Sequence, residues 1–138
     1  MKGVHFLIPG DPDTRTGGYL YDRRIMAELA ARGWSVALHR LDAGFPAPTP
    51  AALAGADAVL AALPERALVV IDGLALGAMP VIVTRHRDRL RLVALVHHPL
   101  ALETGLDDAA RQRLYASERA ALAQVRGVIV TSPSTARA

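Results

Sequence analysis

The chain has 138 residues, of which 51% are hydrophobic, with a formal net charge of +3 and a pI near 9.9. This length suffices for one domain with a hydrophobic core, and no apolar run approaches the roughly 20 residues of a membrane-spanning helix. The complete lack of cysteine excludes disulfides, thiolate catalysis and Cys-ligated zinc. The apolar stretch after Lys2 is too short for a secretory signal, so we expect a cytoplasmic protein.

Arginine supplies almost all of the positive charge, since Lys2 is the only lysine. Arginine suits bidentate phosphate recognition, although this bias, together with abundant alanine, equally fits a GC-rich genome. The arginines are scattered, and aromatic residues make up only 4% of the chain. Because nucleic-acid-binding surfaces interleave basic and aromatic residues, we expect no nucleic-acid partner.

The amino-terminal part predicts a buried strand followed by an amphipathic helix. The apolar run at residues 4–8 is typical of a strand that is covered on both faces in a parallel sheet. Apolar side chains spaced three and four apart at residues 21–29 predict a helix, and Gly33 stands where its left-handed cap belongs. Strand and helix together make half of a βαβ unit.

The loop at residues 10–18 joins this strand to this helix. Gly17 and Gly18, at the expected helix start, would let a ligand anion reach backbone N–H groups, unless they serve only the backbone. Tyr19 follows the pair, so neither a P-loop nor a G-x-G-x-x-G dinucleotide fingerprint can be drawn. The D-x-D sequence at residues 11–13 predicts a turn rather than a metal site, because it lies beside proline and glycine.

Strand and helix patterns alternate along the rest of the chain. Strands are expected at residues 34–40, 67–73, 92–96 and 128–131, and helices at residues 50–63 and 107–126. Residues 80–84 look strand-like, but parallel strands need a crossover, so residues 74–91 are interpreted as helical. The alternation predicts an α/β fold: a three-layer, Rossmann-like domain with a mostly parallel sheet of about five strands.

Candidate functional residues follow the strand ends, because ligands of such sheets bind beyond the carboxyl ends of the strands. His97 and His98 come directly after the strand at residues 92–96 and could bind a ligand or move a proton near neutral pH. Adjacent strand residues point to opposite faces, so the two should not chelate one metal, and one of them should face the cleft. Alternatively, both are polar strand terminators before Pro99.

The other candidates each have a structural alternative. Asp72 could accept a hydrogen bond from a ligand or from a neighbouring loop backbone, and Glu103 could orient a substrate hydroxyl or cap the next helix. Arg15, Arg23 and Arg24 could reach a phosphate, although the last two are typical of a solvated helix face. Hydrolase motifs of the G-x-S-x-G and H-E-x-x-H types are lacking.

Seven stretches carry a family resemblance: residues 16–24 (TGGYLYDRR), 29–36 (LAARGWSV), 72–74 (DGL), 95–100 (LVHHPL), 103–106 (ETGL), 118–119 (ER) and 130–132 (VTS). Together they resemble the amino-terminal domain of the family 4 glycosyltransferases, which have the GT-B fold. Their order and spacing cover nearly the whole chain.

The resemblance implies a retaining transferase that moves a sugar from a nucleotide-sugar donor to a small-molecule or glycan acceptor, without a required metal. The amino-terminal domain of this family mainly holds the acceptor. By this resemblance, Gly17 and Gly18 would lie against the donor's phosphates and His97 would be the catalytic residue beside the transferred sugar. The acceptor would be bound by Arg15, Asp72, His98 and Glu103.

One departure from the family concerns the carboxyl-terminal domain with its nucleotide site, which residues 1–138 do not include. Residues 132–135 are a helix-start signal with little chain after them, so the chain is either one domain of a longer protein or ends in a vestigial element. We expect the isolated domain to be inactive, with apolar surface that favours self-association and with peripheral membrane contact among its partners.

Two alternatives come from other functional classes. The chain could be a stand-alone Rossmann-like binding module for a phosphorylated or glycan ligand. A nucleotide-dependent oxidoreductase is disfavoured, because the dinucleotide fingerprint is missing.

Overall fold

The computed structural model describes residues 2–10, 17–97, 99–102 and 105–130. The strands are β1 (Gly3–Pro9), β2 (Ser35–Leu41), β3 (Leu68–Asp72), β4 (Arg91–Val96) and β5 (Gly127–Val130). They form one sheet in the order β2-β1-β3-β4-β5, and every neighbouring pair is parallel. The helices are α1 (Gly17–Ala31), α2 (Pro50–Ala62), α3 (Gly73–Leu76), α4 (Pro80–His86) and α5 (Asp108–Leu122), with a 3-10 turn η1 (Leu100–Leu102).

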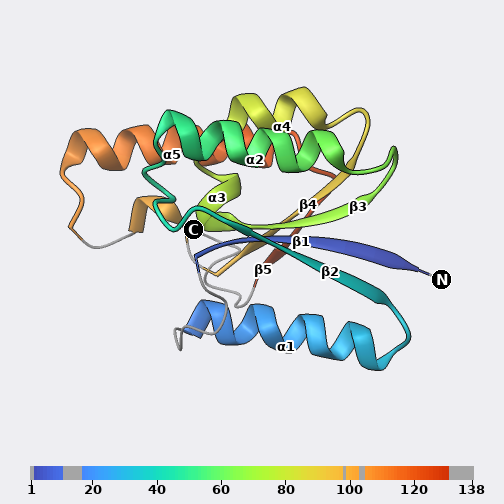
Figure 1. The fold of residues 1–138 in the computed structure, drawn as a ribbon. Helices are drawn as coiled ribbons and strands as arrows, with labels where there is room; N and C mark the ends of the chain where they lie inside the picture. The colour runs from blue at the N-terminus through green and yellow to red at the C-terminus, as the bar shows by residue number, and fades with distance from the viewer. Residues whose placement is uncertain (1, 11–16, 98, 103–104, 131–138) are drawn as a thin grey trace.

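The sheet is the middle of three layers (Figure 1). Helix α1 lies on one face, and α2, α3, α4 and α5 lie on the other. Two hydrophobic clusters follow from this arrangement. The larger joins the α2–α5 layer to strand residues such as Ile71 and Ala94, whereas the smaller joins α1 to residues such as Phe6 and Leu95. The predicted α/β, Rossmann-like fold with a parallel five-stranded sheet is confirmed.

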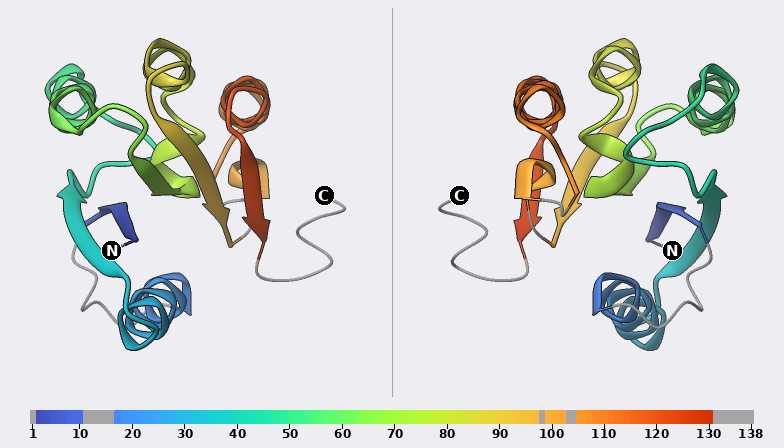
Figure 2. Two further views of the ribbon diagram at one scale, coloured as in Figure 1. Left: turned by 90° about the vertical axis from the view of Figure 1, so that its right-hand side faces the viewer. Right: turned by 90° about the vertical axis from the view of Figure 1, so that its left-hand side faces the viewer.

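The two faces are covered unequally. The side views show α2, α4 and α5 spread over one face, whereas α1 lies under the β2 and β1 side of the other (Figure 2). Beneath β4 and β5 on that face, the described part of the chain places no helix. Ile129 of the edge strand β5 is 39% exposed. None of the helices within the described ranges is long and apolar enough to cross a membrane.

The segment between β3 and β4 contains the two helices α3 and α4, so a helical crossover is confirmed, although residues 77–79 and 87–90 lie outside both helices and Arg91 begins β4. Residues 80–84, although rich in β-branched side chains, lie in α4, where Pro80 occupies the first helical turn that tolerates proline. Ile82 and Val83 are buried against the larger hydrophobic cluster. Tertiary packing therefore overrides the strand propensity of this segment.

Several predicted boundaries shift by one residue or more, and three differences have a structural cause. Helix α5 ends at Leu122 rather than at residue 126, because Ala123 already caps it and Arg126 donates its N–H to Leu92 at the start of the β5 pairing. Gly73, predicted in the third strand, instead begins α3, since Asp72 caps that helix. The predicted loop after Pro99 contains η1, whose first N–H is held by the buried carboxylate of Glu118.

Candidate functional site

Strand alternation brings Asp72 and His97 to the same face of the sheet. Val70 and Leu95 belong to the cluster under α1, and every second residue of a strand points to the same side. Asp72 lies two residues after Val70, and His97 lies two residues after Leu95. The pairing of Asp72 with Leu95 places both side chains at the carboxyl edge of neighbouring strands, facing α1.

The third member of the site is Asp22, which comes from α1. This side chain is fully buried, because it lies on the stripe of α1 that faces the sheet, one turn before Ile25 and Met26. A carboxylate at this place needs a partner inside the protein. That partner is the imidazole of His97.

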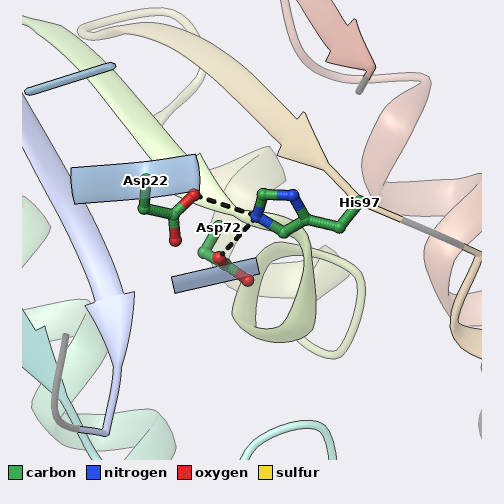
Figure 3. A group of neighbouring side chains, drawn as sticks. All are labelled: Asp22, Asp72 and His97. Atoms are coloured by element: carbon green, nitrogen blue, oxygen red, sulfur yellow. Dashed lines mark hydrogen bonds and ion pairs between the residues drawn. The ribbon is translucent and has the colours of Figure 1, made fainter. Parts of the chain in front are cut away.

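The three side chains converge on one ring nitrogen (Figure 3). Nε2 of His97 donates to Oδ1 of Asp22 at 2.9 Å and lies 3.4 Å from Oδ2 of Asp72. The other ring nitrogen lies on the side of the ring that faces away from both carboxylates. The side chains of Asp22 and Asp72 are 0% and 1% exposed, and that of His97 is 16% exposed, so the histidine is the solvent-facing member.

The two aspartates differ in what else they bind. Oδ1 of Asp72 accepts a hydrogen bond from the N–H of Leu74 at 2.9 Å and thereby caps α3. Oδ2 of Asp22 and Oδ2 of Asp72 are buried, and neither has a hydrogen-bond partner within the described part of the chain. When both aspartates are ionised, Oδ2 of Asp22 therefore has no compensating partner among the described residues, whereas Oδ2 of Asp72 has only the ion pair with His97.

Burial and mutual contact shift the pKa of all three groups. Burial raises the pKa of Asp22 to about 7, and the hydrogen bond to Asp72 adds to this effect. Burial alone would raise the pKa of Asp72 as well, but hydrogen bonds from His97, Asp22 and the Leu74 N–H lower it below its usual range. Burial alone would lower the pKa of His97, yet its two carboxylate partners raise it to about 9. His97 is therefore an imidazolium at neutral pH.

One aromatic ring packs beside the cluster. Tyr21 contacts the ring of His97 edge-on, with the ring centroids 5.7 Å apart. Tyr21 also lines a groove of about 420 Å³ along α1, together with Arg24, Ile25 and Leu29. The ring of His97 is thus held by the carboxylates at Nε2 and by Tyr21 at its side.

The structure brings together only part of the predicted site. His97 and Asp72 are in contact, and Gly17 and Gly18 begin α1 one turn before Asp22, at the same edge of the sheet. Asp72 accepts a hydrogen bond from the N–H of Leu74, which belongs to α3 and not to a loop, so the side chain caps a helix; its contact with a ligand stays a prediction. Arg15, His98 and Glu103 lie outside the described residues, as does the helix-start signal at residues 132–135.

Asp22 was missed by the sequence analysis, although a signal for it exists. The helical stripe at Ile25, Met26 and Leu29 continues backwards to position 22 by steps of three and four. An acidic residue on that buried stripe needs a cation or a proton. Combined with a histidine at the carboxyl end of a strand, this signal would have indicated the pair.

We also compared the chain with known proteins. No protein-family model matches it, and no curated protein matches it either. The resemblance to the family 4 glycosyltransferases therefore stays a prediction.

The geometry limits what this site can do chemically. It holds an imidazolium ring in a fixed orientation at the edge where ligands of parallel sheets bind, with its charge offset by the two carboxylates behind it. The three side chains include no hydroxyl or thiol nucleophile. Their ligating atoms all lie within 4.8 Å of one another, so the same three groups could instead hold a metal ion.

Proposed function

We propose that this chain is the acceptor-side domain of a retaining glycosyltransferase, which uses a nucleotide-sugar donor and acts with a second, nucleotide-binding domain in the cytoplasm. The observation that supports the proposal most is the contact of His97 with Asp22, because it joins the end of β4 to the helix that Gly17 and Gly18 begin. A charged ring and a pair of helix-start glycines therefore share one edge of the sheet.

In the proposed reaction, an acceptor hydroxyl oxygen bonds to the anomeric carbon of the sugar. The bond between that carbon and the diphosphate oxygen breaks, the nucleoside diphosphate leaves with the electron pair, and a phosphate oxygen takes the hydroxyl proton. The backbone N–H groups of Gly17 and Gly18 bind the diphosphate. His97 lies beside the transferred sugar, where a polar ring of fixed orientation stabilises the charge that develops in the transition state.

The aspartates hold His97 in this proposal. Asp72 is buried and bonded to Leu74, so its place is behind the histidine rather than against the acceptor. Asp22 likewise lies behind the histidine, on the side of helix α1. Arg15, His98 and Glu103 remain the residues proposed to bind a small-molecule or glycan acceptor.

The experiment is a nucleotide-sugar turnover assay with the natural full-length protein, scored by release of nucleoside diphosphate. His97→Ala should lower kcat by about 100-fold, the usual cost of losing one preorganised electrostatic group. His39→Gln is the control, because His39 pairs with His5 across β1 and β2 rather than with the residues of the cluster. Undiminished transfer by His97→Ala would remove this residue from the site.

One observation favours a second candidate, a stand-alone binding module for a phosphorylated or glycan ligand. Nε2 of His97 points inward to the two carboxylates. This arrangement fixes the ring for ligand binding and does not require that any reaction takes place. If no nucleotide sugar is turned over, titration with phosphorylated sugars and glycans decides between the two. Saturable binding that His97→Ala weakens would support the module.

A further inference from the structure

We propose that Asp22, Asp72 and His97 form a binding site for one divalent transition-metal ion, with Zn²⁺ as the best-suited ion. The inference does not rest on glycosyl transfer, because it concerns what the three side chains bind in the absence of any sugar or nucleotide. The same three side chains would then exist in a metal-free state and in a metal-bound state.

The spacing of the ligand atoms suits a metal ion. Ligand atoms at about 2.1 Å from a tetrahedral zinc lie about 3.4 Å apart. Nε2 of His97 lies 2.9 Å from Oδ1 of Asp22 and 3.4 Å from Oδ2 of Asp72, and all three ligating atoms are within 4.8 Å of one another. Small side-chain rotations would complete three protein ligands.

The uncompensated oxygens are an independent reason to expect a cation. Oδ2 of Asp22 and Oδ2 of Asp72 belong to side chains that are 0% and 1% exposed, and neither accepts a hydrogen bond from the described residues, although Oδ2 of Asp72 lies 3.4 Å from Nε2 of His97. A buried carboxylate oxygen without a partner is costly. A divalent ion would neutralise both carboxylates at once, whereas the imidazolium of His97 supplies one positive charge for the two of them.

The donor set selects among ions. An imidazole nitrogen disfavours Mg²⁺ and Ca²⁺, which prefer oxygen ligands. Two carboxylates and one imidazole suit Zn²⁺, which also binds more tightly than Mn²⁺ or Fe²⁺ to a given set of such ligands. When the Nε2–zinc bond forms, the Nε2 proton leaves to solvent, as does the proton of Asp22 where that carboxyl is protonated. His97 is the one proposed ligand whose side chain is partly exposed, at 16%.

Two other groups of acidic or histidine side chains are weaker candidates for a metal site. His5 and His39 form a pair with only two ligand nitrogens. Asp57 contacts His86, but the guanidinium of Arg85 lies 2.6 Å from the same carboxylate, so that acid is already neutralised by a fixed cation. Among the described residues, only the Asp22, Asp72 and His97 cluster brings three ligating residues together.

The test is isothermal titration calorimetry, in which Zn²⁺ alone is added to the EDTA-treated and desalted chain. One ion should bind per chain, and Asp22→Asn should raise Kd by at least about 10-fold, since even changes to groups behind the ligands cost 10- to 100-fold. The matched control is Asp57→Asn, which alters another histidine-bound aspartate and should leave Kd unchanged. Mg²⁺ should not compete.

A second measurement keeps the test decisive if Asp22→Asn does not fold. In the wild-type chain, Zn²⁺ should shift the Nε2 resonance of His97 and leave those of His5 and His39 in place. The proposal is overturned if no saturable binding occurs up to about 1 mM Zn²⁺. It is equally overturned if His5→Gln abolishes binding, because the ion would then lie on the strand pair.

Discussion

His97 and Asp22 are 75 positions apart in the chain, yet Nε2 of one and Oδ1 of the other are 2.9 Å apart, in a place from which the aspartate is closed to solvent. This contact ties the first helix to the carboxyl end of β4. Since Asp72 joins it from β3, the protonation of one histidine is linked to the position of three elements that define the edge of the sheet.

The first prediction concerns the charge of His97. In the chain kept metal-free with EDTA, its ring should titrate with a pKa of about 9, because two carboxylates outweigh the effect of burial. Asp22→Asn should lower this pKa, since it removes one negative charge and leaves the burial. Titration followed by NMR of the ring signals is the measurement. A wild-type pKa at or below the ordinary 6.5 would contradict the assigned contacts.

The second prediction concerns the pH dependence of stability through His39. Burial and the neighbouring charge of His5 lower the pKa of His39 below its ordinary value of 6.5. The unfolded chain therefore binds a proton at a higher pH than the folded chain, so this residue costs stability as the pH falls below about 6.5. Above that pH the cost vanishes.

Urea unfolding at pH 5.5 and at pH 7.5 checks this prediction. His39→Gln should lose less stability than the wild type between the two pH values, because glutamine takes up no proton. His5→Gln should act in the same direction but more weakly, since it removes the charge beside His39 and leaves its burial. If His39→Gln had the same pH dependence as the wild type, the His39 ring would have the same pKa in the folded and the unfolded chain, and the prediction would be wrong.

The fold could be predicted from the sequence because its signals are local. Apolar runs such as residues 67–71 and helix signals such as Thr49-Pro50 act within a few residues, and the structure has β3 and a Thr49-capped α2 there. The end of α5 could not be predicted, because Arg126 is drawn out of the helix by its bond to Leu92, a contact between distant segments.

The site could be predicted only in part, for the same reason. His97 and Asp72 stand at strand ends, and that placement can be inferred from the order of the elements. Whether Asp22 faces the cluster depends on how α1 is rotated about its axis against the sheet. The apolar stripe of α1 indicates this rotation, but it points to Asp22 only if the stripe is extended to include that residue. The inward direction of Nε2 depends on two carboxylates from different elements, which no local pattern encodes.

The third prediction concerns Arg89, which caps the carboxyl end of α2. Its Nη1 donates to the carbonyl of Leu63 at 2.6 Å and its Nη2 to that of Leu60 at 2.7 Å. An ammonium cannot reproduce this planar fork, so Arg89→Lys should lower the free energy of unfolding by about 1–2 kcal/mol. The control Arg87→Lys alters an exposed arginine and should stay within about 0.5 kcal/mol of the wild type. Equal stability of both variants would show that the fork is dispensable.

The fourth prediction concerns the two glycines Gly77 and Gly55. A Cβ at Gly77 would lie 2.6 Å from Cδ1 of Leu100, which is buried, and 3.1 Å from the carbonyl oxygen of Gly73. Gly77→Ala should therefore lower the free energy of unfolding by about 1–3 kcal/mol, the usual cost of overpacking. Gly55 lies inside α2 with nothing within 4 Å of its added Cβ, so Gly55→Ala should stabilise by up to about 1 kcal/mol.

The Gly77 variant also tests how the site is supported. Leu100 lies three residues after His97, and its N–H is held by the buried carboxylate of Glu118, whose Cβ would be 3.3 Å from the added methyl group. Urea unfolding measures the stability of both variants, and NMR reports the His97 ring. Gly77→Ala should shift the ring signals of His97, whereas Gly55→Ala should leave them in place. If Gly77→Ala is as stable as the wild type and leaves these signals unchanged, then η1 yields to the methyl group and does not help to position His97.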